Sequence, residues 1–450
     1  MSDEIMSRRS SLFRRLKFAT LVGLFALTFL SGYAVHRKKL TPHYWIESAY
    51  FRFREWIDSE DYPAGYWRYA RQSSSAMTRE QEDEVRKLAS LGYLPGTRTG
   101  SLEGGVTVHE PQLARQGMNL YSSGHGPEAI LMDMDGRVRH RWRMPYRKVF
   151  PNAPPPAEDQ ASAHYWRRVH LYPNGDLIAI FDGLGILMLD RDSKVLWSLD
   201  NASHHDISVA ENGAVYTLTR IAHMIPELNE HKPILEDFIT LLSRDGVEQE
   251  HYSVLDALRN SDFSTLLEHT KNYGDLLHTN ALQILDARHE VLSPLFKEGN
   301  ALVSMPGVDT IAVIDLEANR VVWAMTGMFD DQHDPTMLEN GNVLLFDNHG
   351  RGGRSRVLEI DALTLEVVSR YPAEIGLDLY TQFCGAAQRL PNGNTLITES
   401  EAGRAIEITI DNHIVWEFRT PHRAGKGDEL IASLMDMQRV PVPEFLEADN

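Results

Sequence analysis

Three short motifs place histidine beside other polar residues at similar points of the sequence: HHD at 204–206, HTN at 278–280 and QHD at 332–334. Each motif comes just before a run of residues typical of a β-strand. Imidazole is a nucleophile, a proton carrier and a metal ligand near neutral pH, because its pKa is about 6.5. One histidine at such a place is usually a core or turn residue, but three in equivalent places favour a shared site.

The motifs fall within a repeated unit that begins near residue 104. Each unit has a turn, an apolar strand, a second strand that ends in Asp, and a strand that often ends in Trp. Asn-Gly pairs mark four of the turns, where glycine supplies the positive φ that tight hairpins need. The pairs lie at 174–175, 212–213, 340–341 and 392–393, and the terminal tryptophans are Trp142, Trp197, Trp323 and Trp416.

Six such units predict an all-β fold, a six-bladed β-propeller, with seven blades as the alternative count. Blades stacked around an axis bury each other's faces, which a single sheet cannot do. We expect the tryptophans to pack between blades and residues 432–441 to close the ring with an N-terminal strand. Insertions at 221–235 and 253–277, the second with helical spacing, are expected above one face. The ring would bring the three histidine motifs to one axial opening.

The N-terminal part of the chain predicts a membrane anchor. Residues 18–35 contain no charged residue, and as a helix they would span about 27 Å. Arginine and lysine before this segment favour a cytoplasmic N-terminus and a translocated body, and a cleaved signal peptide is the alternative. The predicted parts are a basic tail (1–17), the transmembrane helix (18–35), a short helical stalk (36–103), the propeller (104–441) and a C-terminal tail (442–450). The propeller would lie in the periplasm or outside the cell.

Composition excludes some classes of function. The 450 residues carry a formal net charge of −18, which is unsuited to nucleic acid, because phosphate contacts need clustered Lys and Arg. Cys384 is the single cysteine, so an internal disulfide cannot form. We expect it to be a small buried residue near the start of a strand. The sequence leaves the oligomeric state open.

Between about residues 104 and 441 the chain resembles the bacterial arylsulfate sulfotransferase family, whose members do not use phosphoadenosine phosphosulfate. The segments that carry the resemblance are AILMDMDGRVRHRW, SHHDISVAENG, LLHTNALQIL, DTIAVIDLEANRVVW, DDQHDPTMLENGNVLLFDN and RLPNGNTLITE. The resemblance implies a six-bladed propeller that moves a sulfuryl group from an aryl sulfate to a phenol by a ping-pong reaction through a sulfohistidine. His333 matches the nucleophile, His278 a histidine that contacts the sulfuryl group, and His205 a histidine on the phenolic oxygen. It implies no metal or other cofactor.

One departure from the family concerns the cation that would bind the sulfuryl group. The family has an arginine in a serine-rich turn before the strand equivalent to DTIAVID, where this sequence has Pro306. Sulfuryl oxygens need fixed donors or cations, and proline offers neither. Arg220 could take this role, as could the arginines of the loop NHGRGGRSR (348–356). With Arg220, the candidate substrate-binding residues are Asn280 and His204.

Two other functions fit the same residues. A non-catalytic propeller that binds a ligand or partner would share the fold and would be consistent with Pro306. A metal site built from the histidines would need three or four ligands at about 2 Å. A quinoprotein dehydrogenase is disfavoured, because the sequence shows no repeated Trp-docking signature of that class.

Overall fold

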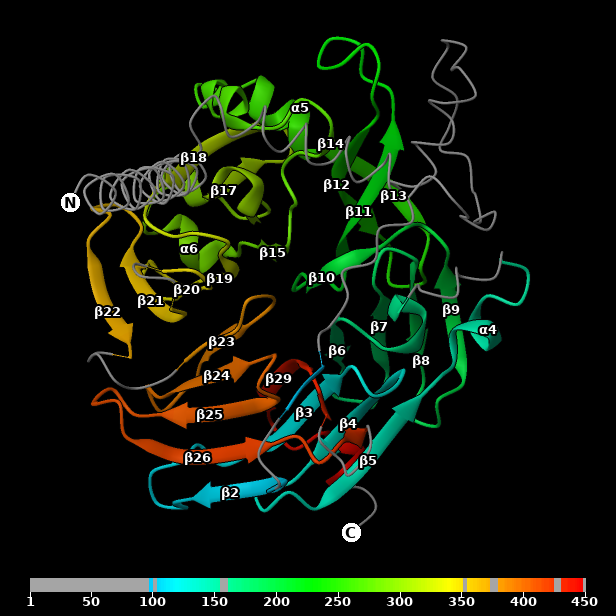
Figure 1. Ribbon diagram of the computed structural model, residues 1–450, viewed down its shortest axis with the longest axis vertical. Helices are drawn as coiled ribbons and strands as arrows, with labels where there is room; N and C mark the ends of the chain where they lie inside the picture. The colour runs from blue at the N-terminus through cyan, green and yellow to red at the C-terminus, as the bar shows by residue number, and fades with distance from the viewer. Residues whose placement is uncertain are drawn as a thin grey trace, which may run out of the picture. The chain divides into compact units, whose positions relative to one another are not determined.

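The computed structural model describes residues 97–99, 103–153, 161–350, 354–372, 379–424 and 430–447. Six sheets, each built on four antiparallel strands, follow one another around a central axis (Figure 1). The described part of the chain is therefore a six-bladed β-propeller, which confirms the predicted fold class and the count of six. Each blade has one innermost strand that faces the axis, and this strand is given first in the descriptions below.

The strands of each blade run in the following order from the axis outward. Blade 1 consists of β29 (Leu434–Val440), β3 (Met118–Ser123), β4 (Glu128–Met132) and β5 (Val138–Arg143). Blade 2 consists of β6 (Val169–Leu171), β7 (Leu177–Phe181), β8 (Gly185–Leu189) and β9 (Val195–Leu199). Blade 3 consists of β10 (His204–Val209), β11 (Val215–His223), β12 (Ile234–Leu242) and β13 (Glu248–Ser253), with β14 (Gly274–Asp275) beside β12.

The remaining blades follow the same pattern. Blade 4 consists of β15 (Ala281–Ile284), β16 (Ala301–Met305), β17 (Thr310–Asp315) and β18 (Arg320–Thr326). Blade 5 consists of β19 (His333–Met337), β20 (Asn342–Asp347), β21 (Arg356–Asp361) and β22 (Val367–Tyr371). Blade 6 consists of β23 (Ala386–Arg389), β24 (Thr395–Glu399), β25 (Arg404–Ile408) and β26 (Ile414–Arg419), with β2 (Gly105–His109) outside. A small separate sheet joins β1 (Thr97–Thr99), β28 (Leu430–Ala432) and β27 (Arg423–Ala424).

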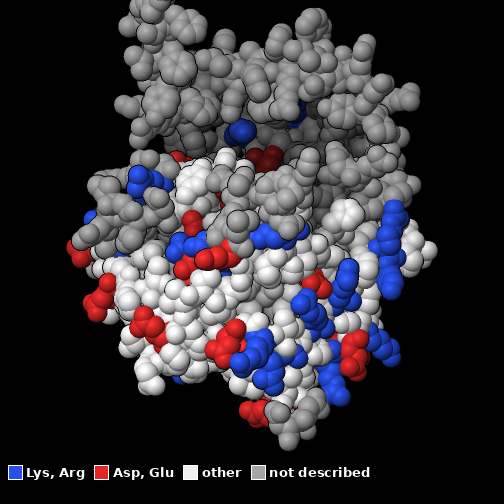
Figure 2. All heavy atoms as spheres, turned by 60° about the horizontal axis from the view of Figure 1, so that its bottom comes forward, with Lys and Arg blue, Asp and Glu red and all other residues white. Residues whose placement is uncertain are grey.

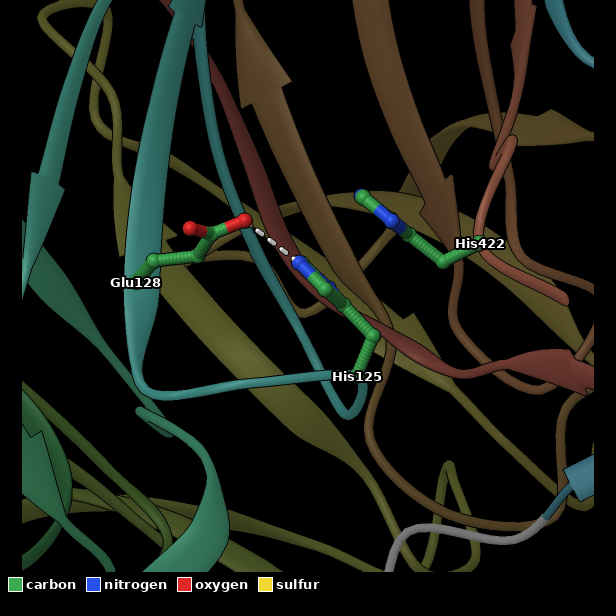
Figure 3. Close-up of side chains that lie close together, drawn as sticks. All are labelled: His125, Glu128 and His422. Carbon is green, nitrogen blue, oxygen red and sulfur yellow. Dashed lines mark hydrogen bonds and ion pairs between the residues drawn. The ribbon is translucent and has the colours of Figure 1, made fainter. Parts of the chain in front are cut away.

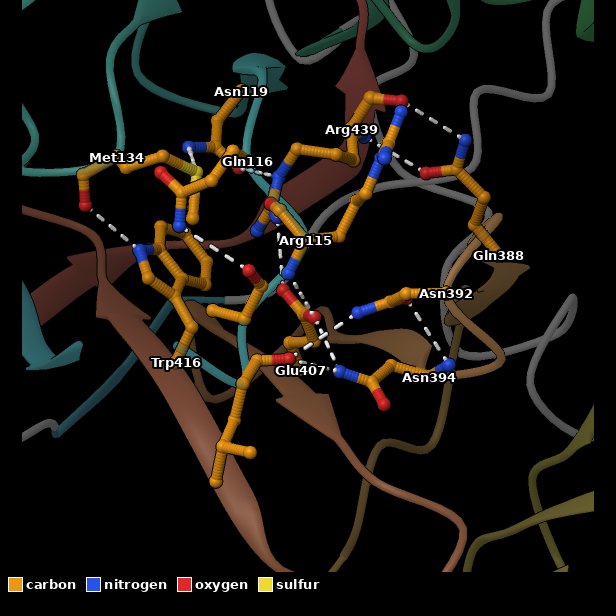
Figure 4. Close-up of polar contacts among 12 residues, drawn as sticks. Arg115, Gln116, Asn119, Met134, Gln388, Asn392, Asn394, Glu407, Trp416 and Arg439 are labelled. Carbon is orange, nitrogen blue, oxygen red and sulfur yellow. Dashed lines mark hydrogen bonds and ion pairs between the residues drawn. The ribbon is translucent and has the colours of Figure 1, made fainter. Parts of the chain in front are cut away.

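The C-terminal strand closes the ring, as the sequence predicts for residues 432–441. Strand β29 pairs antiparallel with β3, so blade 1 contains both ends of the propeller. The buried side chain of Arg439 reinforces this join (Figure 4). Its Nε donates to Asn119 on β3 at 2.8 Å, and its Nη1 donates to Glu407 on β25 at 2.8 Å. The guanidinium also lies 5.2 Å from the ring centre of Trp416, so one charge links blade 1 to blade 6.

Tryptophans on the fourth strand from the axis connect successive blades. In four blades the indole Nε1 donates to a backbone carbonyl in a turn of the next blade, at 2.9 Å in every case. The pairs are Trp142 with Gly175, Trp197 with Arg244, Trp323 with Ala362, and Trp416 with Met134. The predicted packing of these rings between blades is confirmed, and the repeated hydrogen bond explains why the position favours Trp over Phe.

Short helices lie in the connections between strands. They are α4 (Tyr146–Val149), α5 (Val254–Arg259), α6 (Ala287–Glu290) and α7 (Glu444–Glu447), with 3-10 turns η1 (Ala161–His164), η2 (Ser264–His269), η3 (Pro294–Phe296) and η4 (Pro306–Val308). Helices α5 and η2 lie within the insertion at 253–277, as its helical spacing predicts. The side chain of Ser253 caps α5 by accepting from the N–H of Asp256, a favourable N-cap arrangement.

The outer edge of blade 1 is strongly basic. The exposed basic side chains of strand β5, of the turn before it and of helix α4 are Arg137, Arg139, Arg141, Arg143, Arg147 and Lys148. Lys and Arg gather over this side of the described surface in Figure 2. Because β5 is an unpaired edge, its charges oppose pairing with another strand.

The predicted transmembrane helix at 18–35 and most of the predicted stalk at 36–103 lie outside the described residues. Among the helices that the structure does describe, none is both long and apolar enough to cross a membrane. Of the predicted stalk, β1 at 97–99 pairs with β28.

Candidate active site at the propeller axis

The structure brings the three predicted catalytic histidines to the inner ends of neighbouring blades. His205 lies in β10, His278 lies three residues before β15, and His333 begins β19. The ring centres of His205 and His278 are 5.3 Å apart. The charge of His278 or of His333 lowers the pKa of His205, and the charge of His278 lowers the pKa of His333. The imidazoles therefore form one electrostatically coupled group.

Hydrogen bonds fix the tautomer of His333. Its Nδ1 lies 2.8 Å from Oδ1 of Asn348 and 3.0 Å from the carbonyl oxygen of Asp331. The amide group of Asn348 donates to the carbonyls of Thr381 and Cys384, so its Oδ1 must face His333 as an acceptor. With two acceptors around it, Nδ1 carries the proton and Nε2 keeps its lone pair.

Burial keeps His333 uncharged. Burial is the largest cause that lowers its pKa, Arg167 lowers it further, and the value falls to about 4. At neutral pH the ring is therefore a free base. A neutral imidazole with an unprotonated Nε2 is the form that a nucleophile requires.

His278 has the opposite electrostatic environment. Its Nδ1 lies 2.7 Å from Oδ2 of Asp275. Burial works to lower the pKa of His278, but the charge and hydrogen bond of Asp275 outweigh it and raise the pKa above its ordinary value. The side chain of His278 is 29% exposed, whereas His205 and His333 are 4% and 9% exposed as residues. A ligand would thus reach the group from the side of His278.

His205 and His204 form a buried pair. Their Nδ1 atoms lie 2.8 Å apart, which requires one ring to donate and the other to accept. Burial lowers the pKa of both rings well below the ordinary value. Both are therefore neutral, and His205 lies on the side of His278, while His204 lies 3.6 Å from Asp237.

Two buried arginines flank the histidines. Arg167, which precedes β6, lowers the pKa of His205 and of His333 after burial, so its guanidinium lies near both. Arg220 on β11 lowers the pKa of His204 and of His278 in the same way. Both arginines are under 8% exposed. Buried carboxylates lie near them as well, since Asp182 acts on the pKa of Arg167 and Asp237 on that of His278. The site therefore holds charges of both signs, with the two guanidiniums as its cations.

The turn that carries Pro306 lies against the segment of His278. The N–H of Gly307 donates to the carbonyl of Leu277 at 2.9 Å, and a Cβ at Gly307 would come within 2.1 Å of the carbonyl oxygen of Leu276. The charge of Arg220 acts on His278 from the neighbouring blade, and the charge of Arg167 acts on His205 and His333. These two arginines provide cations that Pro306 cannot.

The arginines of the loop at 348–356 do not take this role. One contacts other groups, one is exposed and one lies outside the described residues. Arg356 donates to Asp347 at 2.7 Å and to the carbonyl of Met328 at 3.0 Å. Arg354 is exposed, and Arg351 lies outside the described residues. The structure thus favours Arg220 over this loop.

Asn280 serves as a link between blades. Its side-chain amide donates to the carbonyl of Gln332 at 3.0 Å, next to His333. Its Oδ1 is buried and has no hydrogen-bond partner among the described residues. The structure therefore places Asn280 next to the segment of His333, with an acceptor oxygen and the second N–H of its amide left over from these contacts.

A charged hub on the axis holds this group together. The guanidinium of Arg168 contacts three carboxylates from three other blades: Asp206 at 2.7 Å, Asp334 at 2.5 Å and Asp436 at 3.1 Å. The second oxygens of Asp206 and Asp334 accept from the N–H groups of Leu282 and Ala387, at 2.9 and 3.1 Å. These six residues come one from each blade.

Backbone conformation is strained at the same place. His205, His278 and Asp334 have φ values of 56°, 53° and 52°. Such left-handed conformations cost roughly 1–3 kcal/mol in residues other than glycine, and they concentrate where function requires them. Two of the three predicted catalytic histidines are therefore held in conformations that the isolated chain would avoid.

A sequence signal for Arg167 and Arg168 exists, although the histidine motifs alone do not reveal it. Arg167, His205 and His333 each stand seven residues before the Asn of an Asn-Gly turn, at 174, 212 and 340. Arg168 likewise aligns with Asp206 and Asp334, six residues before the same turns. Counting back from the turns would have found both arginines.

Two surface cavities of about 410 Å³ lie away from this group. One is formed by residues of blades 3 and 4, including Tyr216 and Asp315, and the other by residues around Phe150 and Leu199. Neither is lined by a histidine, so neither coincides with the predicted chemistry.

Fold and site together define a six-bladed β-propeller with histidines and arginines buried at its axis. Residues 168–421 match the family model described as Arylsulfotransferase (ASST), which is more than half of the chain. The chain therefore belongs to the arylsulfotransferase (ASST) family, which confirms the resemblance seen in the sequence. A search of curated proteins finds no match.

Solved structures show a more distant likeness. A protein of unknown function from Bacteroides caccae is 12% identical with a TM-score of 0.46, covering 71% of this chain and 99% of that one. A catalytically inactive virginiamycin B lyase from Staphylococcus aureus, solved with quinupristin, is 11% identical with a TM-score of 0.39, covering 74% and 98%. At this level of similarity neither structure informs the function of this chain.

Proposed function

We propose that this protein transfers a sulfuryl group from an aryl sulfate to a phenol, with His333 as the nucleophile. The observation that carries the proposal is the fixed tautomer of His333, whose Nδ1 faces two acceptors. Family membership supports sulfotransferase activity at the level of the class. The buried Arg167 and Arg220 supply positive charge for the sulfate ester.

In the first half-reaction, Nε2 of His333 forms a bond to sulfur while the bond from sulfur to the aryl oxygen breaks. The phenolate leaves beside His205, which stabilises it through a hydrogen bond, and takes its proton from solvent after release. His278, whose pKa is raised, offers an imidazolium to the sulfuryl oxygens, together with the two arginines. The product is a sulfuryl group on Nε2 of His333.

In the second half-reaction, an acceptor phenol occupies the place of the first. The phenol gives its proton to solvent, and its oxygen accepts the same hydrogen bond from His205 as the new bond from oxygen to sulfur forms and the bond from sulfur to Nε2 breaks. Charge and atoms balance without a metal or an oxidant, and the same residues serve both halves.

The test is phenol release from a chromogenic aryl sulfate, measured with and without an acceptor phenol. His333→Ala should abolish release, whereas His413→Ala, a matched change at an exposed histidine of blade 6, should leave it unchanged. Mass analysis of the wild type quenched without acceptor should find one sulfuryl group on the peptide that contains His333. Turnover that survives in His333→Ala would refute the assignment.

One observation favours a second function, a non-catalytic propeller that binds an anionic ligand. Pro306 replaces the arginine that the family pattern has in the turn beside His278. A wild type that binds an aryl sulfate but releases no phenol from any chromogenic donor would support this function over catalysis.

We also propose that residues 18–35 anchor the protein in a membrane, with the propeller in the periplasm or outside the cell. The support is the uncharged run and the basic residues before it. Full-length protein should stay with membranes after alkaline carbonate extraction, and a variant that lacks residues 1–35 should not. If both partition alike, the segment is not an anchor.

A further inference from the structure

A second group of histidines lies where the two ends of the propeller meet. His125 is in the β3–β4 loop of blade 1, Glu128 begins β4, and His422 follows β26 of blade 6. One ligand atom from each of these three side chains lies within 4.8 Å of the others. In Figure 3 both rings are seen edge on, point in the same direction and lie beside the carboxylate.

The two imidazoles are unusually close for unbonded groups. Their ring centres are 3.3 Å apart and their planes differ by 5°, while Nε2 of His125 lies 2.6 Å from Oε1 of Glu128. Two imidazolium ions could not stack in this way, because their charges would repel. The arrangement requires at least one neutral ring, and one ring must turn out of the stack for the two lone pairs, which lie in the ring planes, to reach one ion.

Neighbouring hydroxyls orient the rings. Oγ of Ser123 lies 2.5 Å from Nδ1 of His125, which directs Nε2 of that ring toward Glu128. The hydroxyl of Tyr121 lies 3.3 Å from Nε2 of His422. Histidines that bind metals commonly hold a partner of this kind on the nitrogen that does not bind.

One cation opposes a bound metal. Nη1 of Arg141 lies 3.1 Å from the same Oε1 of Glu128 that contacts His125, and Arg143 also acts on this carboxylate. The side chain of Arg141 is 47% exposed, so it can turn into solvent when a metal binds. Its charge should still weaken binding, which makes Arg141 a useful probe.

We propose that His125, Glu128 and His422 bind one divalent metal ion of the zinc class, with water completing the coordination. Two histidines and one carboxylate with an open fourth position form a known type of zinc ligand set. The ion would join the first blade to the end of the sixth, and so would strengthen the closure of the ring. This inference is independent of the proposed sulfuryl transfer.

The experiment uses the full chain, freed of metal with a chelator and then titrated with Zn²⁺ by calorimetry and with Co²⁺ by absorption. We expect one equivalent to bind, visible Co²⁺ bands of low-symmetry coordination, and a higher unfolding temperature that the chelator reverses. His125→Ala and His422→Gln should each weaken Zn²⁺ binding by at least the roughly 10–100-fold that loss of an outer partner costs.

Two variants make the test sharper. Arg141→Gln should bind Zn²⁺ more tightly than the wild type, because it removes a positive charge and a competitor for Glu128. His413→Ala, at an exposed histidine of the same blade as His422, should bind as the wild type does. Failure of the folded wild type to bind either ion would overturn the proposal, as would equal affinity in wild type and His422→Gln.

Discussion

Removal of the guanidinium of Arg168 should be among the most damaging single changes in the propeller. In Arg168→Met, the carboxylates of Asp206, Asp334 and Asp436 lose contacts of 2.7, 2.5 and 3.1 Å to a common cation. These carboxylates are 6%, 16% and 3% exposed. Water can therefore do little to replace the lost partner.

The magnitude follows from the number of charges that lose their partner. Breaking one buried ion pair from one side costs about 3–5 kcal/mol, and here one change leaves three carboxylates facing each other. We expect a loss near the upper end, about 5 kcal/mol at neutral pH. Total stabilities are about 5–15 kcal/mol, so the variant should be marginally folded. Arg168→Lys keeps the charge but cannot contact three carboxylates in one plane, so its loss should be smaller.

The loss should depend on pH in a definite direction. Burial raises the pKa of Asp206 even with Arg168 present, and loss of that cation raises it further above the unfolded value of about 4. The ionised carboxylate therefore destabilises the fold as pH rises through the folded pKa. The difference between wild type and Arg168→Met should therefore shrink on going from pH 7.5 to 4.5. Urea unfolding at both pH values measures this. Arg191→Met, at an exposed arginine of the same blade, is the matched control, and equal urea midpoints for the two variants would refute the reasoning.

Three further predictions concern the site and the blades. The rate of sulfuryl transfer should fall in acid as His333 is protonated near its pKa of about 4, and should fall in base above the raised pKa of His278. In the pH profile of kcat/KM, His278→Gln should lose the decrease on the basic side. Gly307→Ala should reduce turnover more than it reduces stability, because the added Cβ would come within 2.1 Å of the carbonyl oxygen of Leu276 and displace the segment that leads to His278. A kcat equal to that of the wild type would contradict this. Trp142→Phe should cost about 1 kcal/mol in unfolding free energy from the lost indole hydrogen bond, and no change in the urea midpoint would exclude a role for that bond.

The blade pattern could be predicted from the sequence because its signals are local. Asn-Gly turns need a positive φ, and Gly175, Gly213, Gly341 and Gly393 all have it. The closing strand could also be predicted, since one blade would otherwise lack its inner strand. The convergence of the histidines follows from the same repeat, because equivalent positions of different blades must face one axis.

Protonation states could not be predicted from the sequence. The opposite pKa directions of His278 and His333 depend on Asp275 and on burial. Asp275 lies three residues before His278, where a sequence reader has no reason to choose it over other acidic residues. The fixed tautomer of His333 depends on Asn348 in the loop after β20, whose orientation is set by Thr381 and Cys384.

Arg167 and Arg168 show why the histidine motifs alone do not predict the whole site. Histidine motifs attract attention because imidazole is reactive. The repeat, however, brings to the axis whichever residue each blade has seven positions before the Asn of its Asn-Gly turn. In blade 2 that residue is Arg167, and the next one is Arg168. Arginines in sequence are usually solvated, so only their register with His205 and Asp206 separates them from the exposed arginines of β5.

The same register couples stability to chemistry. In blades 2, 3 and 5, the residue six positions before the Asn of the Asn-Gly turn belongs to the charged hub around Arg168. The residue seven positions before that Asn belongs to the candidate site. Asp206 and Asp334 directly follow His205 and His333, so the hub fixes the backbone on which both imidazoles stand. A blade that shifted by one residue would exchange hub and site positions. The contact of Arg168 with three other blades therefore sets where the two histidines point as well as holding the ring closed.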